Sequence, residues 1–193
     1  MIRLVLGLGN PGAQYARTRH NAGIWFAESL RDGASWSDKS SLHASLARVQ
    51  YAGCALLLAR TLVYMNQSGM TAQAVLRYHR LETGAMLVAH DDLDLPCGTV
   101  RLKWGGGDGG HLGLRDISRL VGPEYWRLRL GIGRPPRGED VRGFVLGEPN
   151  AEEQRAMTEA IERGRKGLAH LLCQEVDQAH LAVQGISPAQ GTA

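Results

Sequence analysis

The side chains best suited to acid–base chemistry belong to a histidine and to a run of acidic residues. His20 opens a predicted helix, and residues 90–94, with the sequence His-Asp-Asp-Leu-Asp, end a buried apolar run. Because α/β sheets place their sites at the carboxyl ends of strands, we expect a carboxylate of this run to reach the imidazole of His20. A carboxylate bonded to one imidazole nitrogen fixes the tautomer and leaves the other nitrogen as a general base. The sequence therefore predicts general-base chemistry, although a single histidine is more often structural or solvated.

The sequence offers no protein nucleophile beside this pair. It contains no Gly-x-Ser-x-Gly elbow, and Cys97 follows Pro96 in a predicted turn with no neighbour that would activate its thiol. Water is therefore the expected attacking group. Asn10 stands at the carboxyl end of the first predicted strand, so we expect it at the same sheet edge as His20.

A glycine-rich turn raises a different interpretation. Residues 7–12, Gly-Leu-Gly-Asn-Pro-Gly, satisfy the dinucleotide-binding pattern G-x-G-x-x-G directly after a predicted strand. That fingerprint also needs a helix opening at the glycines and an acidic residue about 20 positions on, at the end of a second strand. Glu28 is the nearest acidic residue and lies in a predicted helix, while the next predicted strand begins near Leu42. A tight glycine turn is therefore the favoured interpretation.

A metal site is a second alternative. The candidate ligands are six histidine and aspartate side chains, His90, Asp91, Asp92, Asp94, Asp108 and His111. Their spacing matches no helical or zinc-type pattern, and acidic turns are more often solvated connections, so we expect no metal and no cofactor. The glycine-rich residues 105–110 lead into His111 at the start of a predicted helix. Their backbone amides could hold an anion, and a flexible lid would use the same glycines.

Strand-like and helix-like segments alternate along the chain. Apolar runs and alternation predict strands at residues 2–8, 42–51, 54–59, 86–89, 99–103 and 126–132. Helical spacing predicts helices at residues 20–30, 68–79 and 111–120, and one long helix from 150 to about 180. Asn66 or Ser68 is expected to cap the second helix, and Asn150 with Glu153 has capping-box spacing. The order predicts a single α/β domain over residues 1–184, with a mixed central β-sheet flanked by helices, and a frayed tail at 185–193.

Composition agrees with one folded domain. The 193 residues are 44% hydrophobic and 21% charged, which excludes disordered, collagen-like and coiled-coil proteins. No apolar run approaches the roughly 18 residues of a membrane span, no secretion signal is visible and the three cysteines are far apart. We therefore expect a cytoplasmic protein without disulfides. Arginine supplies 19 of the 22 basic residues, which is consistent with a phosphate-bearing partner and equally with genomic base composition.

Several segments together resemble the bacterial peptidyl-tRNA hydrolases, in the order in which that family has them. The segments are Leu8-Gly9-Asn10-Pro11-Gly12 with Tyr15, Thr18-Arg19-His20-Asn21-Ala22-Gly23, Tyr64-Met65-Asn66-Gln67-Ser68-Gly69, residues 88–96, residues 105–113, residues 127–133 and residues 143–147. They span most of the chain. The resemblance implies a single α/β domain and hydrolysis of the ester between a peptide and the 3′ ribose of tRNA.

The resemblance also implies roles for individual residues. His20 matches the catalytic base, Asp91 the residue that stabilises its basic form, and Asn10 the position that helps to distinguish blocked from free aminoacyl-tRNA. Tyr15, Tyr64 and Asn66 match substrate-contacting positions, and Lys103 with Arg129 matches a pair that holds the tRNA 5′ phosphate. The expected partner is peptidyl-tRNA. We expect the protein to be a monomer that binds no membrane.

One residue departs from the family's pattern at a substrate- and water-binding position. Leu112 stands where the family usually has an asparagine, so a substrate amide or the attacking water loses a hydrogen-bond partner. Such a loss costs on the order of 1–3 kcal/mol, which predicts a rate reduced roughly tenfold to a hundredfold. An RNA-binding protein on the same fold with weakened catalysis is therefore the alternative function, whereas the intact Asn10, His20, Asn66 and Asp91 favour the enzyme.

Overall fold

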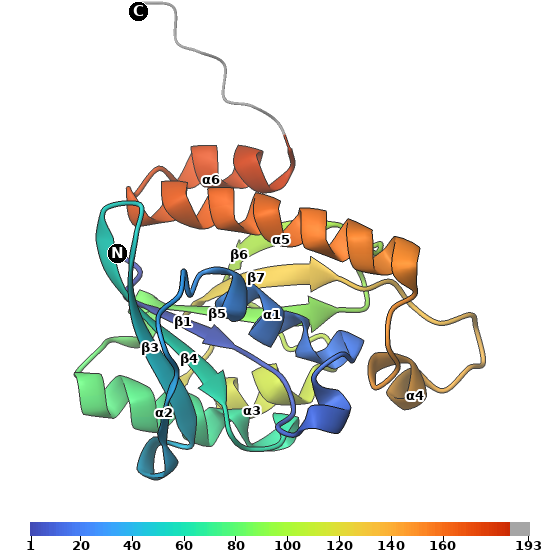
Figure 1. Cartoon of the computed structure of the whole chain (residues 1–193), viewed down its shortest axis with the longest axis horizontal. Coiled ribbons are helices and arrows are strands. Elements are labelled where there is room, and N and C mark those ends of the chain that lie inside the picture. Colours follow the sequence, from blue (N-terminus) through green and yellow to red (C-terminus); the bar gives the residue numbers. More distant parts are fainter. Residues whose placement is uncertain (186–193) are drawn as a thin grey trace, which may run out of the picture.

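The computed structural model describes residues 1–185, which form one α/β domain (Figure 1). The strands are β1 (Leu4–Gly7), β2 (Ser37–Lys39), β3 (Ala44–Tyr51), β4 (Cys54–Thr61), β5 (Met86–Asp92), β6 (Val100–Trp104) and β7 (Trp126–Gly131). Within these residues they form one mixed sheet in the order β2-β3-β4-β1-β5-β7-β6. The central strands β4, β1, β5 and β7 pair in parallel, and β2, β3 and β6 join them through antiparallel pairs. The predicted fold class is confirmed.

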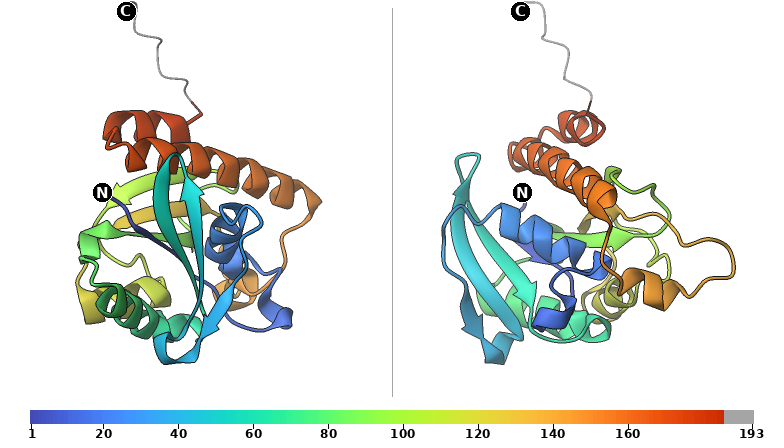
Figure 2. Two further views of the ribbon diagram at one scale, coloured as in Figure 1. Left: turned by 60° about the vertical axis from the view of Figure 1, so that its left-hand side comes forward. Right: turned by 45° about the vertical axis from the view of Figure 1, so that its right-hand side comes forward.

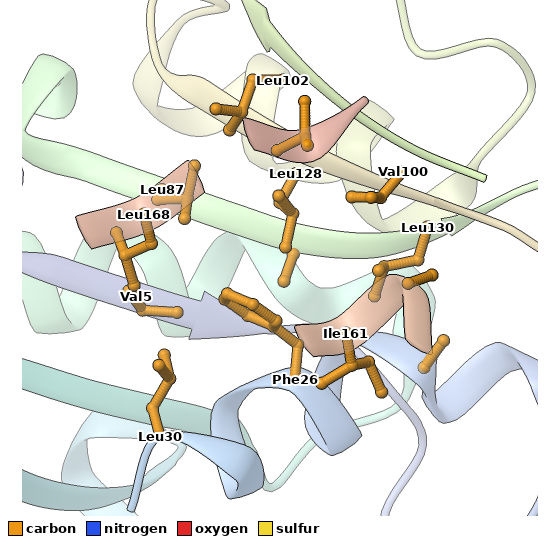
Figure 3. Packing of buried hydrophobic residues seen from close by; sticks show 14 of the residues in the cluster. Val5, Phe26, Leu30, Leu87, Val100, Leu102, Leu128, Leu130, Ile161 and Leu168 are labelled. Carbon is orange, nitrogen blue, oxygen red and sulfur yellow. The ribbon is translucent and has the colours of Figure 1, made fainter. Parts of the chain in front are cut away.

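Helices cover both faces of the sheet (Figures 1 and 2). They are α1 (Ala22–Ser29), α2 (Ser68–His79), α3 (Leu112–Val121), α4 (Val141–Val145), α5 (Ala151–Leu172) and α6 (Val176–Val183). One apolar cluster joins α1, α5 and α6 to one face, and a second joins α2 and α3 to the other. Figure 3 shows part of the first cluster, in which Phe26 of α1 points toward Leu128 of β7 and Ile161 of α5 lies on the side of Leu130.

The central strands are apolar on both sides, as expected of parallel strands between two helical layers. Along β5, Leu87 and Ala89 belong to the first cluster, whereas Met86 and Val88 belong to the second. This alternation follows from the period of two in a strand. Because β1, β5 and β7 run in parallel, their carboxyl ends meet at one edge of the sheet, and the polar residues that follow them are brought together there.

The first glycine-rich turn is explained by close packing of α1 on the sheet. A Cβ atom on Gly23 would lie 2.1 Å from the carbonyl oxygen of Ala89, and one on Gly7 would lie 2.5 Å from the carbonyl oxygen of Gly23. Only residues without a side chain permit this approach. The helix also begins at Ala22 rather than at the glycines, so the dinucleotide-binding context is absent from the described residues.

The six predicted strands and the first three predicted helices are confirmed, with ends that shift by a few residues. The capping box is also confirmed, since Asn150 Oδ1 accepts from the backbone N–H of Glu153 and Glu153 Oε2 accepts from that of Asn150. The single helix predicted from 150 to about 180 is wrong. The chain turns at Gln174, which has a left-handed φ of 65°, and α5 and α6 pack against each other as separate helices.

The predicted cap of α2 is wrong as well. Gln67 precedes the helix without a side-chain capping bond, and the hydroxyl of Ser68 donates instead to the carbonyl of Met65. β2 and α4 have no counterpart among the predicted elements. No helix within residues 1–185 combines the length and the apolar character that crossing a membrane requires. The predicted frayed tail, apart from Gly185, lies outside the described residues.

Candidate active site

A cleft of about 1180 Å³ opens at the carboxyl ends of β1 and β5, and α3 and α4 contribute to its walls. The residues that the resemblance assigns to catalysis or to substrate binding all line this cleft. These residues are Asn10, Tyr15, His20, Tyr64, Asn66, Asp91, Lys103, Leu112 and Arg129. The topology therefore brings together side chains that are up to about 120 positions apart in the chain.

His20 and Asp91 form a close pair. His20 lies in a short 3₁₀ helix, Arg19–Asn21, directly before α1, and Asp91 lies near the end of β5. His20 Nδ1 is 2.9 Å from each carboxylate oxygen of Asp91. Because an ionised carboxylate can only accept hydrogen bonds, Nδ1 carries the proton and Nε2 keeps its lone pair. Nε2 has no hydrogen-bond partner among the described residues, and the ring lines the cleft.

Burial and mutual attraction act against each other at this pair. Burial disfavours the charged imidazolium, but the negative charge of Asp91 and the hydrogen bond to it outweigh burial and raise the pKa of His20 above its ordinary value of 6.5. Burial likewise disfavours ionised Asp91, but the attraction of His20 and His111 outweighs it and lowers the pKa of the carboxyl group. Asp91 is therefore ionised, as the hydrogen-bond assignment requires.

His111 is a second imidazole on Asp91, whereas its sequence context suggests a role only as a metal ligand. Its Nε2 lies 3.0 Å from Asp91 Oδ1, and its Nδ1 accepts the backbone N–H of Leu114 at 3.3 Å. His111 is thus the N-cap of α3, and this bond fixes Nδ1 as the acceptor and Nε2 as the donor. The sequence signal that could have located it was a polar residue between a glycine run and a helix start.

His90 lies beneath this group and stays neutral. Its Nδ1 donates to the backbone carbonyl of Asp91 at 2.7 Å, and its ring meets that of His111 edge-on at a centroid distance of 5.1 Å. Burial, followed by the nearby His111, lowers the pKa of His90 to about 3. Its Nε2 is buried without a hydrogen-bond partner among the described residues. His90 therefore supports the site as an uncharged ring.

Asn10 is held in one orientation at the inner end of the cleft. Its Oδ1 accepts the backbone N–H of Met65 at 2.8 Å. Its backbone is fixed by Asn21, whose side-chain amide accepts from Asn10 N–H and donates to Asn10 C=O. The occupied oxygen leaves Asn10 Nδ2 as a hydrogen-bond donor at the cleft.

The outer wall carries exposed aromatic and apolar groups. Tyr15 and Tyr64 meet edge to face at a centroid distance of 6.3 Å, and Asn66 follows in the next 3₁₀ turn, Met65–Gln67. Leu112, the first residue of α3, is 49% exposed and lines the cleft. An apolar side chain therefore occupies the position that the resemblance assigns to an amide.

Lys103 and Arg129 lie on the paired strands β6 and β7. The register places Lys103 opposite Arg127 and Arg101 opposite Arg129, so Lys103 and Arg129 are diagonal neighbours on one face of the sheet. Arg129 Nε donates to Asp92 Oδ2 at 2.7 Å. Burial raises the pKa of Asp92, but the hydrogen bond from Arg129 outweighs it, so the pKa lies below its usual value. This contact leaves the terminal nitrogens of Arg129 available.

Arg127 holds the glycine-rich residues 105–110 in place through hydrogen bonds. This arginine is 2% exposed, and its two terminal nitrogens donate to the carbonyl oxygens of Gly106 and Gly107. Its guanidinium lies over the ring of Tyr125 at 4.7 Å. The carbonyls of Gly106 and Gly107 therefore point toward Arg127, and anion binding by the amides of this run stays a prediction.

The six candidate metal ligands from the sequence do not form one group. Three of their carboxylates pair with arginines instead: Asp92 with Arg129, Asp94 with Arg134 and Asp108 with Arg115. Within the described residues, one cluster has ligand atoms close enough to hold a metal ion, and it consists of His20, Asp91 and His111.

Comparison with known proteins identifies relatives of this chain. A model of the peptidyl-tRNA hydrolase family matches residues 4–190. A peptidyl-tRNA hydrolase of Edwardsiella ictaluri is 44% identical over 188 residues, which are 95% of this chain and 96% of the relative. One of an Azoarcus species is 49% identical over 164 residues, 83% of this chain and 74% of the relative.

A solved structure is equally similar in shape. The crystal structure of peptidyl-tRNA hydrolase from Acinetobacter baumannii superposes with a TM-score of 0.91 at 42% identity and covers 97% of each chain. At this identity and coverage the similarity extends beyond the fold to the whole domain that surrounds the cleft.

Proposed function

The chain belongs to the peptidyl-tRNA hydrolase family and hydrolyses the ester that joins a peptide to tRNA, and we propose that His20 activates the attacking water. The observation that carries this proposal is the contact of His20 Nδ1 with both carboxylate oxygens of Asp91. This contact leaves Nε2 as a base at the cleft. None of the comparisons supports the alternative of an RNA-binding protein with weakened catalysis.

The proton path follows from the tautomer. His20 Nε2 accepts a proton from water while the water oxygen attacks the carbonyl carbon of the ester. The bond between that carbon and the 3′ ribose oxygen then breaks, and the proton on Nε2 passes to the ribose oxygen. The products are the peptide with a free carboxyl group and tRNA with a free 3′ hydroxyl. Asp91 stabilises the imidazolium that exists between these two transfers, and His111 keeps Asp91 in place.

Asn10 would recognise the acylated amino group of the substrate. Its Nδ2 is the free donor because its Oδ1 is bound by Met65. An amino group that carries a peptide or another acyl group presents a carbonyl oxygen next to it, which can accept from Nδ2. A free amino group is charged and presents only donors, so it leaves Nδ2 unpaired. This difference would favour peptidyl-tRNA over aminoacyl-tRNA.

Lys103 and Arg129 would bind the 5′ phosphate of tRNA. Two cations that are diagonal neighbours on a sheet can converge on one phosphate, and Arg129 still has free terminal nitrogens. Tyr15, Tyr64 and Asn66 line the same cleft and would contact the peptide and the 3′ end. We also propose that the protein acts as a monomer in the cytoplasm, where translation supplies its substrate.

The direct test is release of labelled peptide from purified peptidyl-tRNA by the wild-type protein and by Asp91→Asn. An asparagine of the same shape cannot accept from both histidines without turning a donor toward one of them. We expect hydrolysis by the wild type and a clearly slower rate for Asp91→Asn, with unchanged tRNA binding. Equal rates in a folded variant would contradict the proposed pair.

A further inference from the structure

Asp91 and Asp92 are neighbours in the chain but differ in what balances their charge. Asp92 is paired with the guanidinium of Arg129. The Asp91 side chain is 2% exposed, and its partners are the two imidazoles of His20 and His111. Within the described residues no lysine or arginine lies within ion-pair distance of Asp91. A buried carboxylate that is not matched by a permanent positive charge is a favourable place for a cation.

The three side chains bring potential ligand atoms close enough to hold a metal ion. One ligand atom from each of His20, Asp91 and His111 lies within 4.8 Å of the other two. A tetrahedral zinc ion with bonds of about 2.0–2.2 Å separates its ligand atoms by about 3.3–3.5 Å. Asp91 Oδ1 is 2.9 Å from His20 Nδ1 and 3.0 Å from His111 Nε2, so these two separations lengthen by a few tenths of an ångström when an ion binds, while the two histidine nitrogens already lie within 4.8 Å of each other. The cleft can supply water as the fourth ligand.

We propose that His20, Asp91 and His111 form an inhibitory site for a divalent transition metal ion of the Zn²⁺ or Co²⁺ type. Two imidazoles and one carboxylate are a donor set that suits these ions. Mg²⁺ prefers six oxygen ligands in an octahedron, and this group offers one carboxylate. The site therefore distinguishes Zn²⁺ and Co²⁺ from the Mg²⁺ that accompanies RNA.

Metal binding would switch off the base by changing its tautomer. The ion takes the lone pair of His20 Nδ1, so the proton of this ring moves to Nε2, and Nε2 can no longer accept a proton from water. At His111 the proton moves from Nε2 to Nδ1, and the N–H of Leu114 loses its acceptor. No proton is lost from either ring. The inhibition, though not the binding, rests on the proposed role of His20.

Binding can be measured without substrate. Titration of the metal-free protein with Co²⁺, followed by visible absorption, is expected to give one tetrahedral Co²⁺ per chain, which excess Zn²⁺ displaces and millimolar Mg²⁺ does not. His111→Asn is the test variant, because asparagine retains a good N-cap for α3 and is a poor ligand. We expect it to weaken Co²⁺ binding at least about tenfold, since loss of an outer-shell partner alone costs that much.

His170→Ala is the matched control. His170 pairs with Glu175 at 2.7 Å on the surface and has no third ligand of the clustered kind. We expect unchanged Co²⁺ affinity and unchanged hydrolysis. The proposal is overturned if the wild type gives no tetrahedral spectrum, if His111→Asn binds Co²⁺ as tightly as the wild type, or if His170→Ala removes binding.

A second measurement separates the metal site from the proposed function. Zn²⁺ is expected to inhibit peptide release by the wild type and by His170→Ala, with half of the activity lost at the Zn²⁺ concentration that half-saturates the site. Binding without inhibition would contradict the role of His20 as the base and leave the metal site intact. Normal hydrolysis with no metal binding would contradict the metal site and leave the proposed role of His20 intact.

Discussion

The two ends of the cleft are built in different ways. At the chemical end, His20, Asp91 and His111 are held by hydrogen bonds, and their side chains are 14%, 2% and 9% exposed. At the end where we propose that the 5′ phosphate binds, called the phosphate end below, Lys103 is exposed and has no ion-pair partner among the described residues, and the side chain of Arg129 is 25% exposed. The chemical end is fixed before the substrate arrives, whereas at the other end Asp92 holds Arg129 and the exposed Lys103 has no partner that orders it.

This difference predicts which kinetic constant each end controls. Groups that are already oriented act on the transition state, so their loss should lower kcat. Exposed cations bind a phosphate far from the ester equally well in the ground state and the transition state, so their loss should raise KM. Substitutions at the two ends should therefore separate the two constants.

His20→Ala is the largest expected effect at the chemical end. Removal of a general base typically costs about 10²–10⁴ in rate, and the phosphate contacts are untouched. We expect hydrolysis to fall by this factor while the Kd for tRNA changes little, as measured by single-turnover peptide release and by equilibrium binding. Near-wild-type turnover by His20→Ala would show that the base is elsewhere.

Leu112→Asn is expected to raise the rate of hydrolysis. The side chain lines the cleft at the first position of α3, so an amide there could hold the substrate or the attacking water. One recovered hydrogen bond of about 1–3 kcal/mol corresponds to a rate increase of up to roughly tenfold to a hundredfold. A folded variant with an unchanged or lower rate would mean that the neighbouring loop is adapted to leucine.

Lys103→Ala tests the phosphate end, and its expected effect is smaller than that of His20→Ala or Leu112→Asn. We expect KM to rise by about one order of magnitude or less and kcat to stay nearly constant. The slope of log affinity against log salt should fall by about 0.7–0.9 for one lost phosphate contact. Substrate whose tRNA lacks the 5′ phosphate should bind the wild type as poorly as the variant.

Lys103→Ala is the cleaner of the two substitutions at this end. Arg129→Ala would also leave Asp92 unpaired, with a side chain that is 12% exposed, and so would lower stability as well as affinity. A variant of Lys103 that still prefers the phosphorylated substrate by the wild-type ratio would place the phosphate site among other arginines.

Treatment with a chelator is expected to have no inhibitory effect. His20 and Asp91 can activate water without a metal, so EDTA should leave the rate of peptide release unchanged or raise it if a transition metal was bound. The RNA must be kept folded with a controlled concentration of Mg²⁺. Loss of activity that a divalent ion restores would contradict this expectation.

Sequence patterns predicted the parts of the site that depend on strand ends. His20 and the acidic run could be placed at one edge because parallel strands deliver their carboxyl ends there. His111 could not be placed in the same way. Its contact with Asp91 depends on the path of residues 105–110, which is set by positive φ angles and by the buried Arg127 rather than by periodicity.

The errors in the fold have a similar origin. The break between α5 and α6 occurs at Gln174, a residue type that gives no turn signal, and it is stabilised by the packing of the two helices on each other. β2 is three residues long and exposed throughout, so it carries no alternation of apolar and polar side chains. Such elements form because a neighbouring strand or helix is already in place.

The edges of the sheet also bear on how copies of this chain meet one another. The edge strand β2 is short and includes Asp38 and Lys39, and the edge strand β6 carries Arg101 and Lys103 as exposed residues. An unpaired edge is a template for strand addition, and like charges on two approaching edges repel. Two β6 edges, each with Arg101 and Lys103, therefore repel each other, whereas β2 limits strand addition by its length of three residues, since Asp38 and Lys39 have opposite charges.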